Sequence, residues 1–177
     1  MQREPLRGEH IILRPLEREH LARCVKWFND SDVTYFLGRE GPLTMEEEER
    51  WFNEYRQKID EEIYALHVDD VHVGNVGLHR IDRMNRKADV GIVIGERNYW
   101  SKGYGTDAMR TILRYAFDHL RLHKVSLDVL EYNTRALRSY EKCGFVREGV
   151  RRDELLKRKR FVNLVRMSLL ESEFRRR

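Results

Sequence analysis

A pair of glycines between an apolar run and an amphipathic run constrains this chain more than any other feature. Residues 88–94 have the composition of a strand, and residues 103–120 carry apolar side chains at helical spacing. The glycines, Gly103 and Gly105, allow a tight turn and leave no Cβ in the way of a ligand. Backbone N–H groups of the turn and of the helix N-terminus then converge on one spot, which suits the oxygens of a phosphate group.

Two nucleotide-binding motifs share features with this segment, and neither fits it well. The glycines and Ala108 match G-x-G-x-x-G/A, and Asp128 follows at about the distance of the acidic residue in dinucleotide-binding domains. However, a polar loop at residues 95–102 separates the strand from the first glycine, and the chain after Asp128 is too short for a doubly wound sheet. A Walker phosphate loop is excluded because Lys102 precedes glycine rather than serine or threonine. The remaining alternative is that the segment is an ordinary helix N-terminus, where the glycines only allow close packing.

The composition is that of one globular domain, which we expect to span residues 1–177. Hydrophobic residues make up 41% of the chain, enough for a core, and the net charge of +4 is too small to indicate nucleic-acid binding. The cysteines, Cys24 and Cys143, form no C-x-x-C motif, which favours a reducing compartment. No apolar run is typical of a signal peptide or reaches the roughly 20 residues of a membrane span. We therefore expect a cytoplasmic protein.

The order of the predicted elements indicates a mixed α/β sheet. Strands are expected at residues 10–13, 63–68, 71–81, 88–94, 125–130, 145–156 and 161–169. Helices are expected at residues 16–28, 44–58, 103–120 and 134–142, with Thr44 and Glu47 as a capping box and Gly144 as a C-cap. Residues 1–7 are expected to be a tail, the strand at 88–94 to be buried on both faces, and the basic turn at 157–160 to be solvated.

Two segments resemble the GNAT superfamily of N-acetyltransferases. The segment Tyr99-Trp100-Ser101-Lys102-Gly103-Tyr104-Gly105-Thr106 is similar to the acyl-CoA pyrophosphate loop of that family, written Q/R-x-x-G-x-G/A. Residues 133–145, NTRALRSYEKCGF, are similar to its N-x-x-A-x-x-x-Y-x-x-x-G-F segment. Trp100 stands where the family usually has Gln or Arg, so we expect the phosphate contacts to come from backbone amides rather than from that side chain.

Shorter matches extend the resemblance over most of the chain. Leu13-Arg14-Pro15-Leu16 resembles the family's first strand, and residues 81–86 resemble the turn before its fourth strand. Glu148-Gly149 and Met167 resemble the branch of RimJ/RimL ribosomal-protein N-terminal acetyltransferases, whose layout bacterial spermidine N-acetyltransferases share. The resemblance implies a mixed, mostly antiparallel central sheet of about seven strands, splayed between strands 4 and 5, with helices on both faces.

The same resemblance implies transfer of acetyl from acetyl-CoA to a primary amine through a tetrahedral intermediate. No metal is expected, because no cluster of His, Cys or Asp has metal-ligand spacing. The pantetheine arm of the coenzyme would pair with the exposed strand edge at Val93 and Ile94 and would contact Asn133, which also suits an ordinary helix N-cap. The pyrophosphate would lie on the loop residues Trp100, Ser101, Lys102, Gly103, Tyr104, Gly105 and Thr106.

Catalytic roles follow from the resemblance at two positions. Tyr140 aligns with a tyrosine that lies near the sulfur of the coenzyme and gives a proton to the leaving thiolate, although it also suits core packing. Asp89 aligns with a carboxylate that draws a proton or binds the substrate cation, or it is a solvated acid at a strand end. His79, on the neighbouring strand, is a second candidate base, ranked below Asp89 because a lone histidine in a strand is more often structural. A backbone N–H of Val93 or Ile94 would stabilise the oxyanion.

The sequence does not settle the acceptor. In the family, the segment at 37–51 shapes the acceptor site, and here it carries an acidic run at 46–49. That run suits a polyamine or a basic peptide N-terminus, and equally a solvated helix face. Two other classes stay open: an RNA- or ribosome-binding module using the basic residues 157–160 and 175–177, and a GNAT fold that binds CoA without catalysis. Family members are often homodimers, and no segment here specifies an interface.

Overall fold

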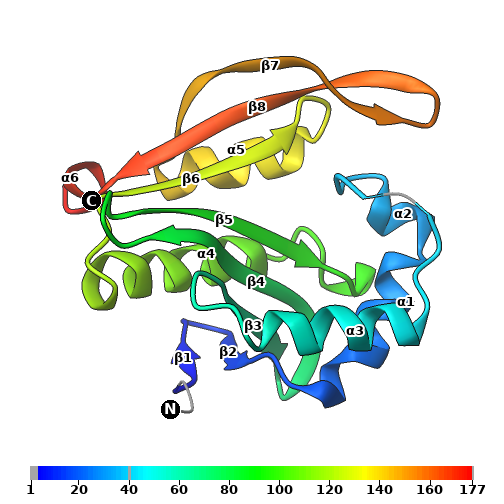
Figure 1. The fold of residues 1–177 in the computed structure, drawn as a ribbon. Coiled ribbons are helices and arrows are strands. Elements are labelled where there is room, and N and C mark those ends of the chain that lie inside the picture. Colours follow the sequence, from blue (N-terminus) through cyan, green and yellow to red (C-terminus); the bar gives the residue numbers. More distant parts are fainter. Residues whose placement is uncertain (1–3, 40, 177) are drawn as a thin grey trace.

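An eight-stranded sheet organises the computed structural model, which describes residues 4–39 and 41–176 (Figure 1). The strand order is β1-β2-β3-β4-β5-β6-β8-β7, and every neighbouring pair is antiparallel except β5 with β6. The strands are β1 (Leu6–Arg7), β2 (Ile12–Pro15), β3 (Glu62–Val68), β4 (Val71–Asp82), β5 (Lys87–Ile94), β6 (Lys124–Leu130), β7 (Val146–Lys157) and β8 (Arg160–Leu170).

The mixed, mostly antiparallel sheet predicted from the sequence is therefore confirmed, with one strand more than the seven expected. The additional strand is β1, which pairs with β2 inside the segment that we expected to be a tail. Backbone pairing with β2 turns that part of the tail into a sheet edge. Residues 1–3 of the expected tail lie outside the described residues.

The sheet opens between β5 and β6, which are the fourth and fifth of the predicted strands. Their parallel pairing covers only residues 87–89 of β5 and 124–126 of β6, although both strands continue beyond. Figure 1 shows the two ribbons diverging from this shared base. The opening corrects one expectation, because residues 91–94 are half-buried rather than buried on both faces. The free edge of β5 therefore borders a cleft instead of a neighbouring strand.

Helices cover both faces of the sheet, as expected. Ile63 and Ala65 of β3 pack into one core, whereas Tyr64 and Leu66 pack into the other, following the alternation of side chains along a strand. The first core is closed by α1 (Leu21–Phe28), α2 (Ser31–Thr34) and α3 (Met45–Tyr55). The second is closed by α4 (Tyr104–Arg114), the π-helical turn Tyr115–His119 and α5 (Thr134–Cys143), while α6 (Glu171–Phe174) follows β8.

The local helix signals have their expected geometry. The Thr44 hydroxyl accepts from the N–H of Glu47 at 3.2 Å, and the Glu47 carboxylate accepts from the N–H of Thr44 at 2.9 Å, which completes the capping box of α3. Gly144 ends α5 in the left-handed region with φ of 102°. Two boundaries differ from expectation: α3 ends at Tyr55 rather than residue 58, and the long helix after the glycines becomes π-helical at residues 115–119.

The closing hairpin of β7 and β8 carries two register shifts, between Arg147 and Gly149 and between Arg151 and Leu155. Its basic turn is not wholly solvated, which corrects our expectation, because the side chain of Lys157 is only 4% exposed and bonds the backbone after α2. None of the helices within the described ranges is long and apolar enough to cross a membrane.

Candidate active site

A cleft of about 1190 Å³ occupies the opening between β5 and β6. One part is bordered by the glycine loop and α5, and the other by the segment after α2, by α3 and by the closing hairpin. Ten of the eleven predicted cofactor-binding positions line it, whereas Lys102 borders only a second, smaller hollow, which Tyr104 also borders. The lining residues among the predicted set are Val93, Ile94, Trp100, Ser101, Gly103, Tyr104, Gly105, Thr106, Asn133 and Tyr140.

The glycine loop has the conformation needed to present backbone N–H groups. Gly103 caps α4 with φ of 90°, a region that favours glycine, and the space beside it is open. The N–H groups of Thr106 and Asp107 both bond the Gly103 carbonyl at 3.0 Å. The N–H groups before them lie at the free end of the helix, where an anion is favoured by unpaired donors and by the helix dipole.

The loop is tied to α5 on the side of the sheet that carries α4. The hydroxyls of Thr106 and Ser139 lie 2.8 Å apart, and the Cys143 thiol lies 3.8 Å from the Thr106 carbonyl. Asn133 begins α5, and its side-chain oxygen accepts from the N–H of Ala136 at 3.2 Å. Asn133 therefore acts as an N-cap while also lining the cleft, so the two roles considered for it are compatible.

The register of β4 with β5 separates Val93 from Ile94. Gly95 bonds Val73 through its N–H at 2.9 Å, and hydrogen-bonded pairs alternate along an antiparallel ladder. The next bonded pair is therefore Val93 with Asn75, so the Val93 backbone is turned toward β4. The backbone of Ile94 faces the open edge, as does that of Ile92. This corrects our expectation for Val93, whose contribution to the cleft is limited to its side chain.

Trp100 stands where the loop of the GNAT family usually has Gln or Arg, and its indole bonds the protein backbone. Its Nε1 donates to the Ile94 carbonyl at 2.7 Å, and its ring packs with the core of the α1 and α3 face. The guanidinium of Arg135 lies 4.2 Å from the centre of the same ring. Trp100 thus fixes the loop to the end of β5.

Tyr140 lies on α5 where the cleft passes between the helix and the open edge of β5. Its ring packs against Phe145, with the ring centres 6.0 Å apart, and against the core beneath α5. Burial raises the pKa of Tyr140 to about 12. The phenol therefore stays protonated over the whole physiological pH range, which is compatible with both the packing role and the acid role considered for it.

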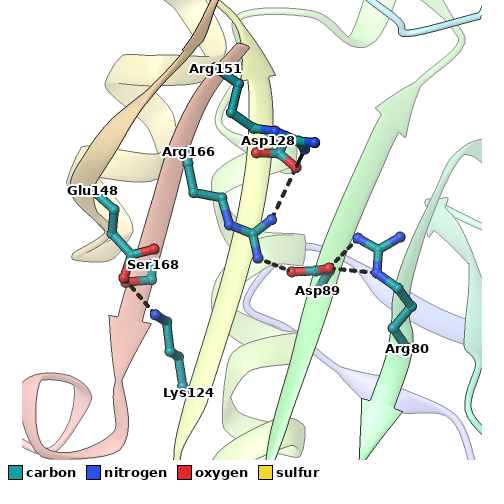
Figure 2. A network of polar contacts seen from close by, with 8 residues as sticks. All are labelled: Arg80, Asp89, Lys124, Asp128, Glu148, Arg151, Arg166 and Ser168. Carbon is teal, nitrogen blue, oxygen red and sulfur yellow. Dashed lines mark hydrogen bonds and ion pairs between the residues drawn. The ribbon is translucent and has the colours of Figure 1, made fainter. Parts of the chain in front are cut away.

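Asp89 is held away from the cleft by two guanidinium groups. Arg166 of β8 donates to it at 2.7 Å, and Arg80 of β4 forms a second ion pair (Figure 2). The same Arg166 also donates to Asp128 of β6 at 3.0 Å, and so bridges β5 and β6 near the point where they part. Asp128 lines the cleft and Asp89 does not. The structure therefore brings Tyr140 and the loop together but leaves Asp89 in an ion-pair network.

His79 lies in the cleft, on the same face of the sheet as Gly77 and Gly91. Its Nε2 would be 3.2 Å from a Cβ on Gly77 and 3.5 Å from one on Gly91, so the two glycines make room for the imidazole. Its Nδ1 lies 3.8 Å from the Glu61 carboxylate. Burial lowers the pKa of His79 despite the nearby carboxylate, so the neutral imidazole is favoured.

Glu48 is the buried member of the acidic run at residues 46–49. Its side chain is 4% exposed and lines the cleft, whereas Glu47 is occupied in the capping box. Among the described residues none makes an ion pair or hydrogen bond with the Glu48 carboxylate, and burial raises its pKa. The sequence showed an acidic run at residues 46–49, but the helical periodicity did not indicate which of these residues would face the cleft.

The part of the chain that is described holds no cluster of His, Cys, Asp and Glu that could bind a metal ion. The cleft instead joins a donor-rich loop, a free strand edge, a phenol and an imidazole. This set suits acyl transfer, in which backbone donors bind anionic groups and side chains move protons.

Known proteins are similar to this chain over nearly its whole length. Spermidine N(1)-acetyltransferase of Vibrio cholerae is 29% identical over 170 residues, covering 94% of this chain and 96% of that protein. The putative ribosomal N-acetyltransferase YdaF of Bacillus subtilis is also 29% identical, with 94% of each chain covered. The crystal structure of spermidine N-acetyltransferase from Vibrio cholerae in complex with CoA and spermine has a TM-score of 0.89 and 28% identity, covering 94% of this chain and 99% of that one.

The family assignment agrees with the fold and with the contents of the cleft. The model of the acetyltransferase (GNAT) domain family matches residues 10–146, which is more than half of the chain and includes the loop, the open strand edge and Tyr140. The protein therefore belongs to the GNAT acetyltransferase family and is an N-acetyltransferase.

Proposed function

We propose that this enzyme transfers acetyl from acetyl-CoA to a primary amine of a cationic small molecule, with a polyamine as the leading acceptor. The single observation that carries the acceptor class is Glu48, a buried carboxylate that lines the cleft and forms no ion pair among the described residues, although the Arg39 guanidinium acts on it electrostatically. A buried unpaired carboxylate is costly, and a bound ammonium group would remove that cost.

The coenzyme end of the cleft fits acetyl-CoA. The N–H groups around Gly103 would hold the pyrophosphate, and the open edge at Ile92 and Ile94 would pair with the pantetheine amides. Asn133 lines the same cleft and would contact this arm. The coenzyme supplies the activated acyl thioester. The bound CoA of the Vibrio cholerae neighbour supports this assignment.

Proton movements are assigned to two residues on opposite sides of the open edge. His79, neutral because of its burial, takes a proton from the acceptor ammonium, so that the amine attacks with its lone pair. An N–H on the open edge of β5 stabilises the oxyanion of the tetrahedral intermediate. Tyr140 gives its proton to the departing thiolate, and the proton shed by the new amide nitrogen restores the phenol.

Asp89 receives a positioning role in this scheme rather than that of the base. Both of its oxygens accept from guanidinium groups, which leaves them poorly suited to take a proton. Through Arg166 it links β5 to β8 across the base of the opening. The separation of the strands above this bridge is what exposes the coenzyme edge.

The acceptor class can be tested by assaying CoA thiol release with matched amines. The KM for spermidine and spermine should be well below that for butylamine, because the monoamine lacks a second ammonium group that could pair with Glu48. Glu48→Gln should raise the KM for spermidine and leave that for butylamine unchanged. Equal use of both amine classes by the native enzyme would contradict the polyamine assignment, and a preference for basic peptide N-termini would replace it. Calorimetry with acetyl-CoA tests the coenzyme separately.

A further inference from the structure

The ammonium group of Lys157 is buried at the tip of the closing hairpin, where it bonds backbone carbonyls. Its Nζ donates to the carbonyls of Thr34 at 2.7 Å, Tyr35 at 3.1 Å and Leu37 at 2.5 Å. The side chain is only 4% exposed, whereas Lys159 in the same turn is exposed. Lysine is rarely buried to this extent, so these bonds to backbone carbonyls call for a role.

The carbonyls belong to the end of α2 and to the chain just after it. The last carbonyls of a helix lack intrahelical partners and lie at the negative end of the helix dipole, so a cation is favoured there. Lysine meets this need with three donors on a single nitrogen atom. The contact joins positions more than a hundred residues apart in the chain and ties the hairpin to α2.

The segment held in this way forms one side of the cleft. We call residues 33–39 the acceptor wall, because Val33, Phe36, Leu37, Gly38 and Arg39 line the cleft. From the hairpin, Leu155 also lines the cleft, and its Cδ1 would be 3.4 Å from a Cβ on Gly38. The hairpin and the acceptor wall therefore meet at the cleft itself.

Two further contacts join the acceptor wall and its approach to neighbouring elements. Tyr132 donates from its hydroxyl to the Tyr35 carbonyl at 2.8 Å. The guanidinium of Arg158 lies 5.0 Å from the centre of the Tyr35 ring and donates to the Ser31 carbonyl at 3.4 Å. Both involve groups that are more exposed than Lys157, so they are expected to hold the backbone less firmly.

We propose that Lys157 is a positioning residue for the acceptor: its ammonium group holds the acceptor wall against the closing hairpin and so sets the shape of the acceptor half of the cleft. This rests on the proposed function, in which the amine enters on the side of α3. The coenzyme half is held by other contacts, chiefly that of Thr106 with Ser139 of α5. Loss of Lys157 should therefore impair use of the acceptor far more than binding of acetyl-CoA.

The test compares Lys157→Met, which keeps the aliphatic stem but not the donors, with Lys159→Met in the same turn. Lys157→Met should raise the acceptor KM about tenfold or more, since small misplacements in a site carry large kinetic costs. The dissociation constant for acetyl-CoA from calorimetry should stay within about twofold, a change near the resolution of such comparisons. Lys159→Met should leave both constants at their native values.

An unchanged acceptor KM in folded Lys157→Met would overturn the proposal, as would an equal loss of acceptor and acetyl-CoA binding. If Lys157→Met does not fold, Lys157→Gln, which keeps two donors on a shorter stem, should give an intermediate rise in acceptor KM, and a native value there would overturn the proposal. Hydrogen exchange at residues 34–39 gives a readout independent of the acceptor. Exchange should quicken in either variant relative to Lys159→Met, even if no amine tested proves to be a substrate. Unchanged exchange would also overturn the proposal.

Discussion

The indole Nε1 of Trp100 lies 2.7 Å from the carbonyl oxygen of Ile94, so the glycine loop is bonded to the open edge of β5 that it adjoins. In the proposed function the loop holds the pyrophosphate of the coenzyme and the strand edge pairs with its pantetheine arm. Their relative position is therefore set within the protein. One acceptor on the strand edge is occupied by the same bond, which leaves the N–H of Ile94 and both backbone groups of Ile92 for the pairing proposed above.

Replacing Trp100 with Phe should weaken acetyl-CoA binding by about fivefold, the equivalent of one ordinary hydrogen bond of about 1 kcal/mol. Phenylalanine keeps most of the packing, so the melting temperature should change little. Calorimetry of acetyl-CoA with each protein measures the effect. Tighter binding in the variant would show instead that the Ile94 carbonyl is more useful to the coenzyme than to the indole.

Replacing Tyr140 with Phe should lower kcat by roughly a hundredfold, the usual scale for losing a general acid, while leaving the dissociation constant for CoA near its native value. The pKa of Tyr140 is raised to about 12, so the phenol stays protonated and should cause no loss of activity up to pH 9. The measurement is a kcat profile against pH for the native enzyme and the variant. An alkaline decline centred below pH 9 that vanishes in the variant would conflict with this assignment.

Replacing His79 with Gln should lower kcat/KM at pH 7 and remove the acidic limb of its pH profile. Burial lowers the pKa of His79 below 6.5, so the neutral base persists to pH values under 6.5 before protonation inactivates it. The matched comparison is Asp89→Asn, which should keep that limb. If Asp89→Asn loses the limb and His79→Gln keeps it, the two roles must be exchanged.

Several features of the helices were predictable because the sequence signals for them are local. Two glycines before an amphipathic helix, the Thr44–Glu47 capping box and Gly144 at the end of α5 each fix a backbone geometry over a few residues. The resemblance to the GNAT family then supplied the splay that no local pattern encodes. Element boundaries were less accurate, as at the end of α3, because fraying and π-helical turns depend on tertiary packing.

The sequence was a good guide to which loop residues line the cleft and a poorer one to the surroundings of the candidate proton-transfer groups. Asp89 looked available because it begins an apolar strand, but its partners Arg80 and Arg166 come from β4 and β8, and only the register brings them together. Val93 and Ile94 looked equivalent until hydrogen-bond alternation separated them. The burial of Lys157 depends on a contact with α2 that lies far away in sequence, so its basic turn looked solvated.

Replacing Asp89 with Asn should lower the free energy of unfolding by roughly 1–3 kcal/mol, because two guanidinium groups lose their charged partner. The Asp89 side chain is 17% exposed and that of Arg166 is 29% exposed, so solvent moderates the loss. Urea denaturation at pH 7 measures it. Arg147→Gln, which breaks an exposed ion pair with Glu141, is the control and should change stability by less than about 1 kcal/mol. If Asp89→Asn has native stability but a much lower kcat, Asp89 takes part in catalysis instead.

A cluster of three histidines should make the fold sensitive to mild acid. The rings of His20 and His67 lie 4.7 and 5.3 Å from that of His72, and all three side chains are buried. Desolvation lowers the pKa of each from 6.5, and that of His72 falls to about 4. The unfolded chain therefore binds more protons than the folded one between these values, so stability is complete above pH 6.5 and declines as pH falls toward 4.

For His72 alone, the free energy of unfolding should fall by about 2 kcal/mol between pH 7 and pH 5. Below the pKa of the unfolded chain, each pH unit costs about 1.4 kcal/mol for every proton that only the unfolded chain binds. Urea midpoints at the two pH values measure this difference. His72→Gln should reduce the pH dependence by that amount whatever its stability at pH 7, because glutamine does not titrate. His10→Gln is the matched control, since the His10 side chain is 68% exposed, and should keep the native dependence. An identical pH dependence in His72→Gln and the native protein would mean that the acid sensitivity arises elsewhere, with the carboxylates as the next groups to replace.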